Sequence, residues 1–495
     1  MTLSLTQPHR PIVGVLWVIL HLLLGALLGA AIGWGPLAAP TGGILVLAVG
    51  LATLFVGLAW WAWRVQRIHL LLWGHVGILL LIGGISLVPL YRVGTFPPPS
   101  QAPEANLRRL LAAMAYAYPY AEEKGIDWGE VEARYLSRAS QIEGHEAYWR
   151  VVSEMLAELN DGHTGVTRPS PQANRRTFAL CRDVAGTIVL AQLGETAREA
   201  GLARGDQVLA VDGLPVERAL EALPPGLASG STSHGRRYVA ALHLLSTTAD
   251  TMRVTVLDAQ GQERTVELVW PADPVPESEA NTTDEPLIRG ERLASGVGLI
   301  RLPTFGAGTG HALVAEFDAA LDALMDAPGL ILDVRGNGGG STMLSDPMAG
   351  RLMTDPFVYG REYFRARLPQ RGVRPWFSYG VRPRGRIYPG PVVVLTDAGT
   401  FSTAENFVVA LVDSGRAVAV GRQTAGASGN PVSFVLPGGG RARFSTGDFR
   451  RKDGTPIEGI GIAPDIPVTW TVDELRQGLD PDLSAAEAWL AQQGP

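Results

Sequence analysis

The sequence predicts a multi-domain α/β protein that begins with three transmembrane helices. Residues 12–38, 43–63 and 69–90 are long apolar runs almost free of charge. Residues 175–271 contain short alternating strands separated by Gly and Asp turns, and residues 297–420 alternate strands with helices. Since strand–helix alternation is typical of a layered sheet covered by helices, an α/β core is expected after the β-rich segment.

Each apolar run reaches the roughly 20 residues that a membrane-spanning helix needs. The 495 residues carry a net charge of -6, and 46% of them are hydrophobic, an excess that lies mainly in these runs. A cleaved signal peptide would be one shorter run, so three runs favour a permanent anchor. Residues 12–90 are therefore predicted to lie in a lipid bilayer.

Basic residues predict the orientation of that anchor. Arg10 precedes the first run, Arg64 and Arg67 separate the second from the third, and the link between the first two has no Lys or Arg. The positive-inside rule then places the N-terminus in the cytoplasm and everything after Tyr91 across the membrane. We therefore expect a multi-pass protein of the cell membrane whose later domains are extracytoplasmic, on the periplasmic or extracellular face.

Composition limits the classes of partner and of cross-link. The acidic balance and the lack of a basic patch or nucleic-acid motif argue against a nucleic-acid partner. Cys181 is the only cysteine, so no intrachain disulfide forms.

Composition shifts and Pro-rich linkers divide the chain into an anchor (1–95), a proline linker with a helical cap (96–170), a β-rich module (171–271), an α/β core (272–480) and a C-terminal tail (481–495).

The α/β core is organised around residues 391–430. Val392–Leu395 reads as a buried strand, and apolar residues at helical spacing run from Ala404 to Leu411. Ser402 therefore lies where a strand passes into a helix N-terminus, where unpaired N–H groups and the helix dipole favour an oxyanion. Ser402 and Glu405 also fit a capping box, in which the hydroxyl only caps the helix.

A glycine loop, Arg335–Ser341, follows the predicted strand 329–334 and has three interpretations. Ser341 occupies the last position of a G-x-G-x-x-G fingerprint, which weakens a dinucleotide site. No Lys follows the glycines, so the loop is not a P-loop. The third interpretation is a nest of backbone N–H groups near a reacting carbonyl, since glycines permit close approach.

Four ordered motifs resemble one family. They are Leu159–Thr164, Asp333–Gly340, Thr396–Glu405 and Gly454–Asp465, with a segment resembling a PDZ domain, Glu195–Gly213, between the first two. Over roughly residues 105–470 the chain resembles the C-terminal-processing (tail-specific) and tricorn-type serine peptidases. The resemblance implies a crotonase/ClpP-like core of stacked β-β-α units, with Ser402 as the nucleophile. It also implies that the PDZ-like module binds extended peptides, often C-terminal segments, at a sheet edge.

The family activates its serine in two ways. One branch uses a Lys after the nucleophile helix, where Ala427 and Ser428 stand here, and the chain's only lysines are Lys124 and Lys452. The tricorn-like branch uses a His from the segment before the PDZ-like module. His163, in the motif Asp-Gly-His-Thr, matches that position. The resemblance therefore implies that His163, and not a lysine, is the base.

The remaining site residues also follow from the resemblance. Glu458 matches the acid that orients the histidine, and Asp465 is its competitor. Asp413 matches a family position too, and we interpret it as structural. The oxyanion donors are expected to be the backbone N–H of Thr403 and one from Gly338 or Gly339.

The predicted function is that of a membrane-anchored serine endopeptidase. It would act on protein or peptide substrates through a Ser402–His163–Glu458 triad and an acyl-enzyme, with no metal or organic cofactor. One alternative is a non-catalytic peptide-binding or scaffold protein on the same fold. Another is a non-peptidase hydrolase or lyase, since fold does not fix function.

Overall fold

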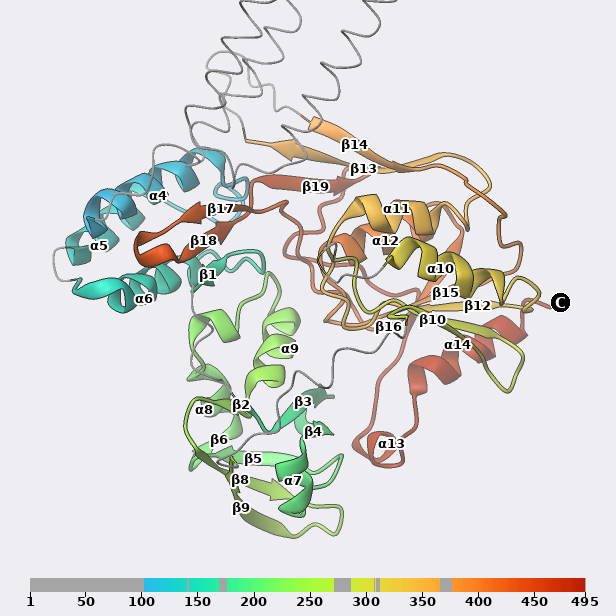
Figure 1. Cartoon of the computed structure of the whole chain (residues 1–495), viewed down its shortest axis with the longest axis horizontal. Helices are drawn as coiled ribbons and strands as arrows, with labels where there is room; N and C mark the ends of the chain where they lie inside the picture. The colour runs from blue at the N-terminus through green and yellow to red at the C-terminus, as the bar shows by residue number, and fades with distance from the viewer. Residues whose placement is uncertain are drawn as a thin grey trace, which may run out of the picture. The chain divides into compact units, whose positions relative to one another are not determined.

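The computed structural model describes residues 102–139, 142–168, 176–270, 286–306, 308, 312–365 and 376–494. The chain divides into two compact units, residues 1–99 and 100–495, and all described residues belong to the second. Within that unit, strands and helices form a central α/β core, a helical cap and a β-rich module (Figure 1).

The predicted fold class needs one correction, which concerns the transmembrane helices. In the described part of the chain, no helix is both long and apolar enough to span a bilayer. The longest helix described there, α4 (Pro103–Ala117), has 15 residues. At 1.5 Å per residue it spans about 22 Å, less than the ~30 Å hydrocarbon core. The described residues therefore form a multi-domain α/β fold, and none of their helices is one of the three predicted spans.

The apolar runs behind that prediction, residues 12–38, 43–63 and 69–90, lie outside the described residues. The extracytoplasmic location rested on the same runs and stays a prediction. So do the domain boundaries drawn from the sequence.

The central sheet has the order β10-β11-β12-β15-β16-β20. Its strands are β10 (Arg289–Arg292), β11 (Gly298–Arg301), β12 (Leu330–Asp333), β15 (Val392–Thr396), β16 (Ala417–Gly421) and β20 (Ile466–Pro467). In this sheet β11, β12, β15, β16 and β20 run parallel to one another, and β10 pairs with β11 antiparallel. The strand–helix alternation predicted for this region is confirmed.

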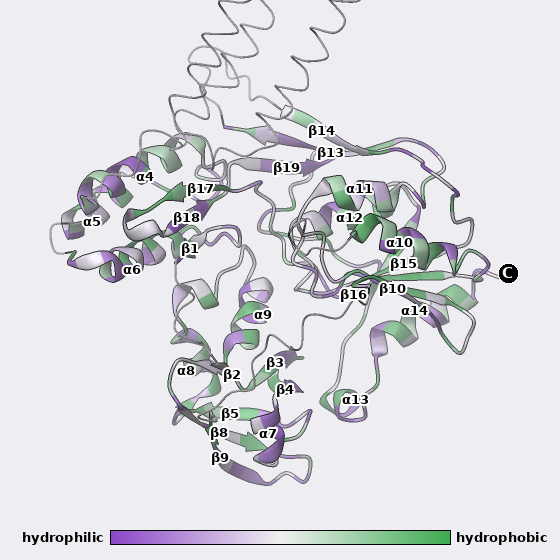
Figure 2. Ribbon diagram, in the orientation of Figure 1, coloured by the Kyte–Doolittle hydropathy of each residue, from purple (hydrophilic) through white to green (hydrophobic). Residues whose placement is uncertain are grey.

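Helices cover both faces of this sheet. They are α10 (Leu313–Asp322), α11 (Thr342–Ala349), α12 (Thr403–Asp413) and α14 (Pro481–Ala491). Alternate residues of β15 point to opposite faces: Val392 and Val394 pack with α10, α11 and α12, while Val393 and Leu395 pack with α14. All five residues of β15 are buried, as a continuous apolar run on a two-sided parallel strand requires. The hydrophobic colouring of the central strands in Figure 2 follows this burial, whereas α7 is mostly hydrophilic.

Two small sheets flank the core. One has the order β14-β13-β19, from Phe357–Phe364 (β13), Trp376–Val381 (β14) and Gly447–Arg451 (β19). The other has the order β1-β18-β17, from Gly165–Thr167 (β1), Val432–Val435 (β17) and Arg441–Phe444 (β18). Because β1 pairs with β18, the strand that follows the His163 loop is hydrogen-bonded to a strand from the second half of the chain.

The helical cap consists of α4, α5 (Trp128–Ala139) and α6 (Gly144–Ala157). Leu107, Leu110, Leu111 and Met114 are buried on one face of α4, as their spacing predicted. The Tyr120 hydroxyl, on the turn after α4, lies 2.9 Å from the Ser428 carbonyl oxygen and 2.8 Å from that of Gly447, and its one proton is shared between them. The cap is therefore joined to the core beside the segment that follows β16.

The β-rich module has a six-stranded sheet and three helices. Its strands are β3 (Ala179–Val184), β4 (Thr187–Leu193), β5 (Gln207–Val211), β6 (Leu214–Pro215), β8 (Thr251–Leu257) and β9 (Glu263–Val269). Its helices are α7 (Glu195–Glu199), α8 (Val216–Glu221) and α9 (Ser233–His243), and a short pair, β2 (Arg176–Thr177) and β7 (Ser246–Thr247), closes its ends. β3 lies at one edge of the sheet, where β4 is its partner.

The C-terminal segment connects the module to the core. After β20, Trp470 and Leu475 pack with Val184 and Val189 of the module, around helix α13 (Val472–Arg476). The guanidinium carbons of Arg182 and Arg422 lie 4.7 and 5.3 Å from the Trp470 ring. One indole therefore stacks against cations from both the module and the core.

Candidate active site

Ser402 lies at the turn between β15 and α12, and its backbone is strained. Its φ of 58° and ψ of -122° are rarely adopted by a residue other than glycine. Asp397 fixes the approach to this turn, because its Oδ1 accepts the Gly336 and Gly399 N–H groups at 2.9 Å each. Ser402 therefore lies at the N-terminus of α12, and the surrounding contacts hold its backbone in a conformation that serine rarely adopts.

His163 meets Ser402 although 239 residues separate them. The Nε2 of His163 lies 2.9 Å from the Ser402 Oγ. Asp161 holds the His163 backbone, since its Oδ1 accepts that N–H at 2.8 Å, and the Phe401 ring packs 4.5 Å from the imidazole. Gly162 has to be small, because a Cβ there would lie 2.7 Å from Phe401 Cε2. The structure therefore brings the predicted nucleophile and base together.

Burial keeps His163 neutral. Desolvation, with a smaller contribution from the Arg443 guanidinium, lowers the pKa of His163 to about 3. The pKa lies below the unfolded value of about 6.5, so this residue's contribution to stability is present above that pH and lost as the pH falls towards 3. A neutral imidazole that accepts the Ser402 proton at Nε2 carries its own proton on Nδ1. That Nδ1 is buried with no hydrogen-bond partner among the described residues.

Glu458 does not supply a direct partner for Nδ1. Its Oε1 lies 2.8 Å from Lys124 Nζ, and its Oε2 accepts the Ser428 N–H at 3.0 Å. The next residue, Gly429, runs alongside His163, since a Cβ there would lie 3.5 Å from Nδ1. The Ser428–Gly429 backbone thus lies between Glu458 and the imidazole, and no hydrogen bond joins the two side chains among the described residues.

The two other acids considered from the sequence are structural. Asp465 Oδ2 accepts the Ala419 N–H of β16 at 2.8 Å, and Asp413 pairs with Arg451. Asp161 is an acid that the sequence interpretation did not consider. It is 2% exposed, and its Oδ2 has no hydrogen-bond partner among the described residues. The only sequence signal for it is its place two residues before His163, in the motif Asp-Gly-His-Thr.

The glycine loop lies against the nucleophile. A Cβ on Gly339 would lie 2.8 Å from both Ser402 Cβ and Thr403 N, whereas Gly338 has open space at the same point. The Gly339 N–H donates to Asn337 Oδ1 at 2.9 Å, so it is already used. Among the described residues the N–H groups of Gly338 and Thr403 have no hydrogen-bond partner. Of the two glycines, Gly338 is the one with an available donor.

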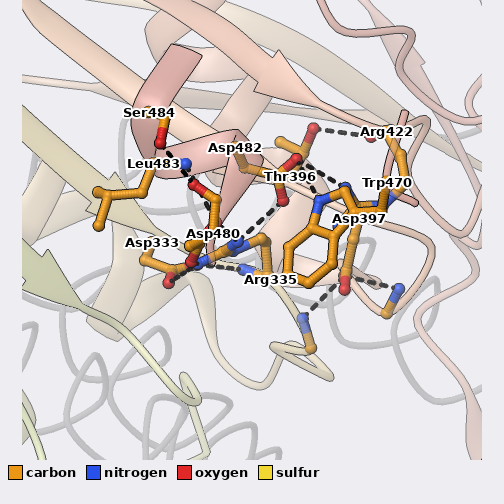
Figure 3. Close-up of polar contacts among 12 residues, drawn as sticks. Asp333, Arg335, Thr396, Asp397, Arg422, Trp470, Asp480, Asp482, Leu483 and Ser484 are labelled. Carbon is orange, nitrogen blue, oxygen red and sulfur yellow. Dashed lines mark hydrogen bonds and ion pairs between the residues drawn. The ribbon is translucent and has the colours of Figure 1, made fainter. Parts of the chain in front are cut away.

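Ion pairs fix the first residue of the glycine loop, Arg335. Arg335, at its start, bonds Asp333 at 2.7 Å, Asp480 at 2.9 Å and Asp482 at 2.8 Å (Figure 3). Asp482 also accepts from Arg422 at 2.7 Å and from the Trp470 indole N–H at 2.9 Å. Because Asp482 is fully buried, the network satisfies charges that would otherwise be costly. The loop's position therefore depends on the C-terminal segment.

Glu405 binds residues 424–427. This segment is next to the position where the lysine-using branch of the family named above is expected to carry its lysine. The Glu405 carboxylate accepts the N–H groups of Ser402, Gly426 and Ala427 at 3.1, 2.8 and 2.9 Å, and the Thr424 hydroxyl at 2.6 Å. Glu405 thus caps the helix, as predicted, and also fastens residues 424–427 to it. Within the described ranges no group of three His, Cys, Asp or Glu side chains is arranged to hold a metal ion.

Comparison with known proteins gives the same family as the motifs. Residues 296–468 match peptidase family S41. The chain is 25% identical over 379 residues to a chloroplastic C-terminal processing peptidase of Tetradesmus obliquus, covering 72% of this chain and 75% of the relative. It is 26% identical over 406 residues to a carboxyl-terminal-processing protease of Picosynechococcus sp., covering 78% and 89%.

Solved structures share the fold. Mature CPAF superposes with a TM-score of 0.64 at 18% identity, over 80% of this chain and 98% of that chain. The photosystem II D1 C-terminal processing protease superposes with a TM-score of 0.50 at 20% identity, over 79% and 97%. Residues 296–468 thus match peptidase family S41, and together with the similarity of the chain to C-terminal processing peptidases this match identifies a serine-type peptidase.

Proposed function

We propose that the protein is an endopeptidase in which Ser402 attacks a peptide carbonyl and His163 accepts the Ser402 proton. The observation that carries this is the 2.9 Å contact between Ser402 Oγ and a neutral, buried imidazole. Attack forms a tetrahedral intermediate, whose collapse gives an acyl-enzyme when His163 returns the proton to the leaving amine. A water molecule, deprotonated by the same imidazole, then releases the acyl group.

Glu458 is proposed as the acid of the triad, acting through its charge. When His163 takes the proton, a buried imidazolium forms, and the Glu458 carboxylate, whose pKa burial and the Asp161 charge raise to about 8, stabilises it at pH values where that carboxylate is ionised. The N–H groups of Gly338 and Thr403 are proposed to bind the oxyanion. Both lie at the loop and helix end that meet at Ser402, and both donors are available there.

Labelling with a fluorophosphonate probe tests this mechanism. The intact protein is expected to be modified once, at Ser402, and the Ser402→Ala variant is expected to remain unmodified. The pKa of His163 is lowered to about 3, so the imidazole is already neutral at pH 6.5, whereas the pKa of Glu458 is raised to about 8; the labelling rate should therefore rise as the pH increases through about 8. Mass spectrometry of the modified peptide identifies the site. A wild-type protein that stays unlabelled would favour the alternative, a non-catalytic peptide-binding protein.

The β-rich module is proposed to be a PDZ-like module that engages protein substrates. Its strand β3 offers a free edge for an added strand, and α9 packs beside it. The N-terminus of α9 is bonded to the core near Ser402: Thr232 donates its hydroxyl to the Ala425 carbonyl at 2.8 Å, and His234 Nε2 lies 2.7 Å from the Thr424 carbonyl. A peptide seated at β3 would therefore be presented by a module attached directly to the catalytic segment.

A substitution that disturbs this module should affect binding more than chemistry. Replacing the Gly205-Asp206 turn is expected to raise KM for a protein substrate and to spare turnover of a short peptide, because the turn supplies no reacting group. Asp206 is buried and its Oδ2 accepts the Ala203 N–H, so the turn is needed for the module's fold. Steady-state kinetics on the two substrates measure the difference. Equal losses on both would show that the module instead positions the catalytic segment.

A further inference from the structure

We propose that Lys124 is a positioning residue for peptide hydrolysis, whose ammonium group holds the Glu458 carboxylate in place beside His163. The inference rests on the proposed Ser402–His163–Glu458 mechanism and adds a residue to it. Lys124 lies in a polar turn after α4, 334 residues from Glu458 in the sequence.

The contacts of Lys124 join the two segments that carry the base and the acid. Its Nζ lies 2.8 Å from Glu458 Oε1 and donates to the Asn160 carbonyl at 2.9 Å. Asn160 directly precedes Asp161, which holds the His163 backbone. The Lys124 ammonium also lies 5.4 Å from the centre of the Tyr120 ring, a cation–π distance. One cation therefore fixes the loop of His163 relative to the turn of Glu458.

The charges around Glu458 explain why a cation is needed there. Glu458 and Asp161 are both buried, and burial, together with the Asp161 charge, raises the pKa of Glu458. Burial likewise raises the pKa of Asp161. The Lys124 ammonium lowers the pKa of both carboxyl groups. The other polar or charged groups that face this cluster are Tyr118, Tyr120, Glu123, Ser231, Ser428, Arg443 and Ser445.

Without Lys124, the pKa values of Glu458 and Asp161 would be higher. Two like charges in one buried site cannot both ionise easily, so loss of the cation raises the pH at which either carboxyl group becomes an anion. At neutral pH, which lies below the Glu458 pKa of about 8, a smaller fraction of Glu458 than in the wild-type protein would then be ionised when the His163 imidazolium forms. The chemical step would lose electrostatic stabilisation, while substrate binding, which does not involve this cluster, would be kept.

The chain's two lysines provide a matched test. Lys124→Met removes the charge and keeps the length, and Lys452→Met is the control, since Lys452 lies over the Phe357 ring and away from the site. In Lys124→Met we expect kcat for a short peptide to fall about 10-fold or more at neutral pH, the effect of one pKa unit of stabilisation, with KM little changed. The ascending limb of its kcat profile should move to higher pH. Lys124→Arg should restore most of the rate.

Chemical modification avoids any effect on folding. In folded Lys452→Met protein Lys124 is the only lysine side chain, and it is 20% exposed. Acetylation, which removes the charge, should reproduce the pH shift, and amidination, which keeps the charge, should not. The Lys124→Arg/Lys452→Met protein, treated alike, controls for the terminal amine.

The outcomes separate this inference from the proposed function. If Lys124→Met and the acetylated protein keep the wild-type kcat and pH limb while Ser402 is labelled normally, the role of Lys124 is wrong and the serine mechanism stands. If the wild-type protein is not labelled at Ser402, both are wrong. Equal recovery by Lys124→Arg and by Lys124→Gln would show that a hydrogen bond, and not charge, is what matters, which also overturns the inference.

Discussion

Replacing Ser402 or His163 with Ala is expected to lower kcat by about 10⁴- to 10⁶-fold, in keeping with losses in other serine triads. The two groups share one hydrogen bond of 2.9 Å and act in the same proton transfer. The double variant should therefore be little worse than either single variant, because neither group works without the other. Hydrolysis of a short fluorogenic peptide, with active-site titration, measures the effect.

The matched control is His145→Ala, which removes an exposed imidazole from α6 and leaves the site intact. Its kcat should stay within about 2-fold of wild type, because a surface substitution usually has little effect. Glu458→Gln should cost less than His163→Ala, since it leaves the base in place. If His163→Ala turned over at the wild-type rate, the mechanism would have to use another base.

Gly339→Ala is expected to give the second large loss, about 10²-fold or more in kcat. The added Cβ would lie 2.7 Å from the Phe401 carbonyl oxygen and 2.8 Å from Ser402 Cβ and Thr403 N. The φ of Gly339 is +85°, which adds backbone strain for any L-residue. The loop would have to move away from the nucleophile, which displaces the Gly338 N–H from the proposed oxyanion position.

Gly261→Ala is the control, because it introduces the backbone strain of a positive φ without the steric clash expected in Gly339→Ala. Gly261 has a φ of +76° and nothing within 4 Å of the position of a Cβ. It should therefore lose only about 1 kcal/mol of unfolding free energy and keep its activity on a short peptide. Thermal unfolding and kcat, measured on both variants, distinguish the two effects. A Gly339→Ala protein with wild-type kcat would mean that the loop does not bind the oxyanion.

Sequence reasoning predicted the meeting of Ser402 and His163 because each lies on a motif with a recognisable pattern. The buried strand, the break and the apolar helix place Ser402, and the resemblance to the tricorn-like branch identifies His163. The interactions of Glu458 could not be predicted in the same way. Its contact with Lys124 joins residues 334 positions apart, and nothing in the turn around Lys124 has a periodic pattern.

The role of the glycine loop was likewise only partly predictable from the sequence. Three glycines in a row predicted a close approach of backbone to a reacting group, but not which N–H is available. That choice follows from the Asn337 side chain, whose Oδ1 takes the Gly339 N–H. A side chain of one residue thus decides the role of its neighbours, and such a choice depends on rotamers that composition and spacing do not encode.

The ion pairs of Arg335 have a consequence for biosynthesis. Asp480 and Asp482 lie 145 and 147 residues after Arg335 in the chain. At the usual 5 to 20 residues per second, translation needs roughly 7 to 30 s to cover that interval. For the last part of this interval, roughly 4 to 16 s between Ser402 and Asp480, Ser402 has already been synthesised, but the loop beside it lacks two of the three aspartates that hold Arg335. We therefore expect the glycine loop of a nascent chain to reach its final position only after Asp482 has been synthesised.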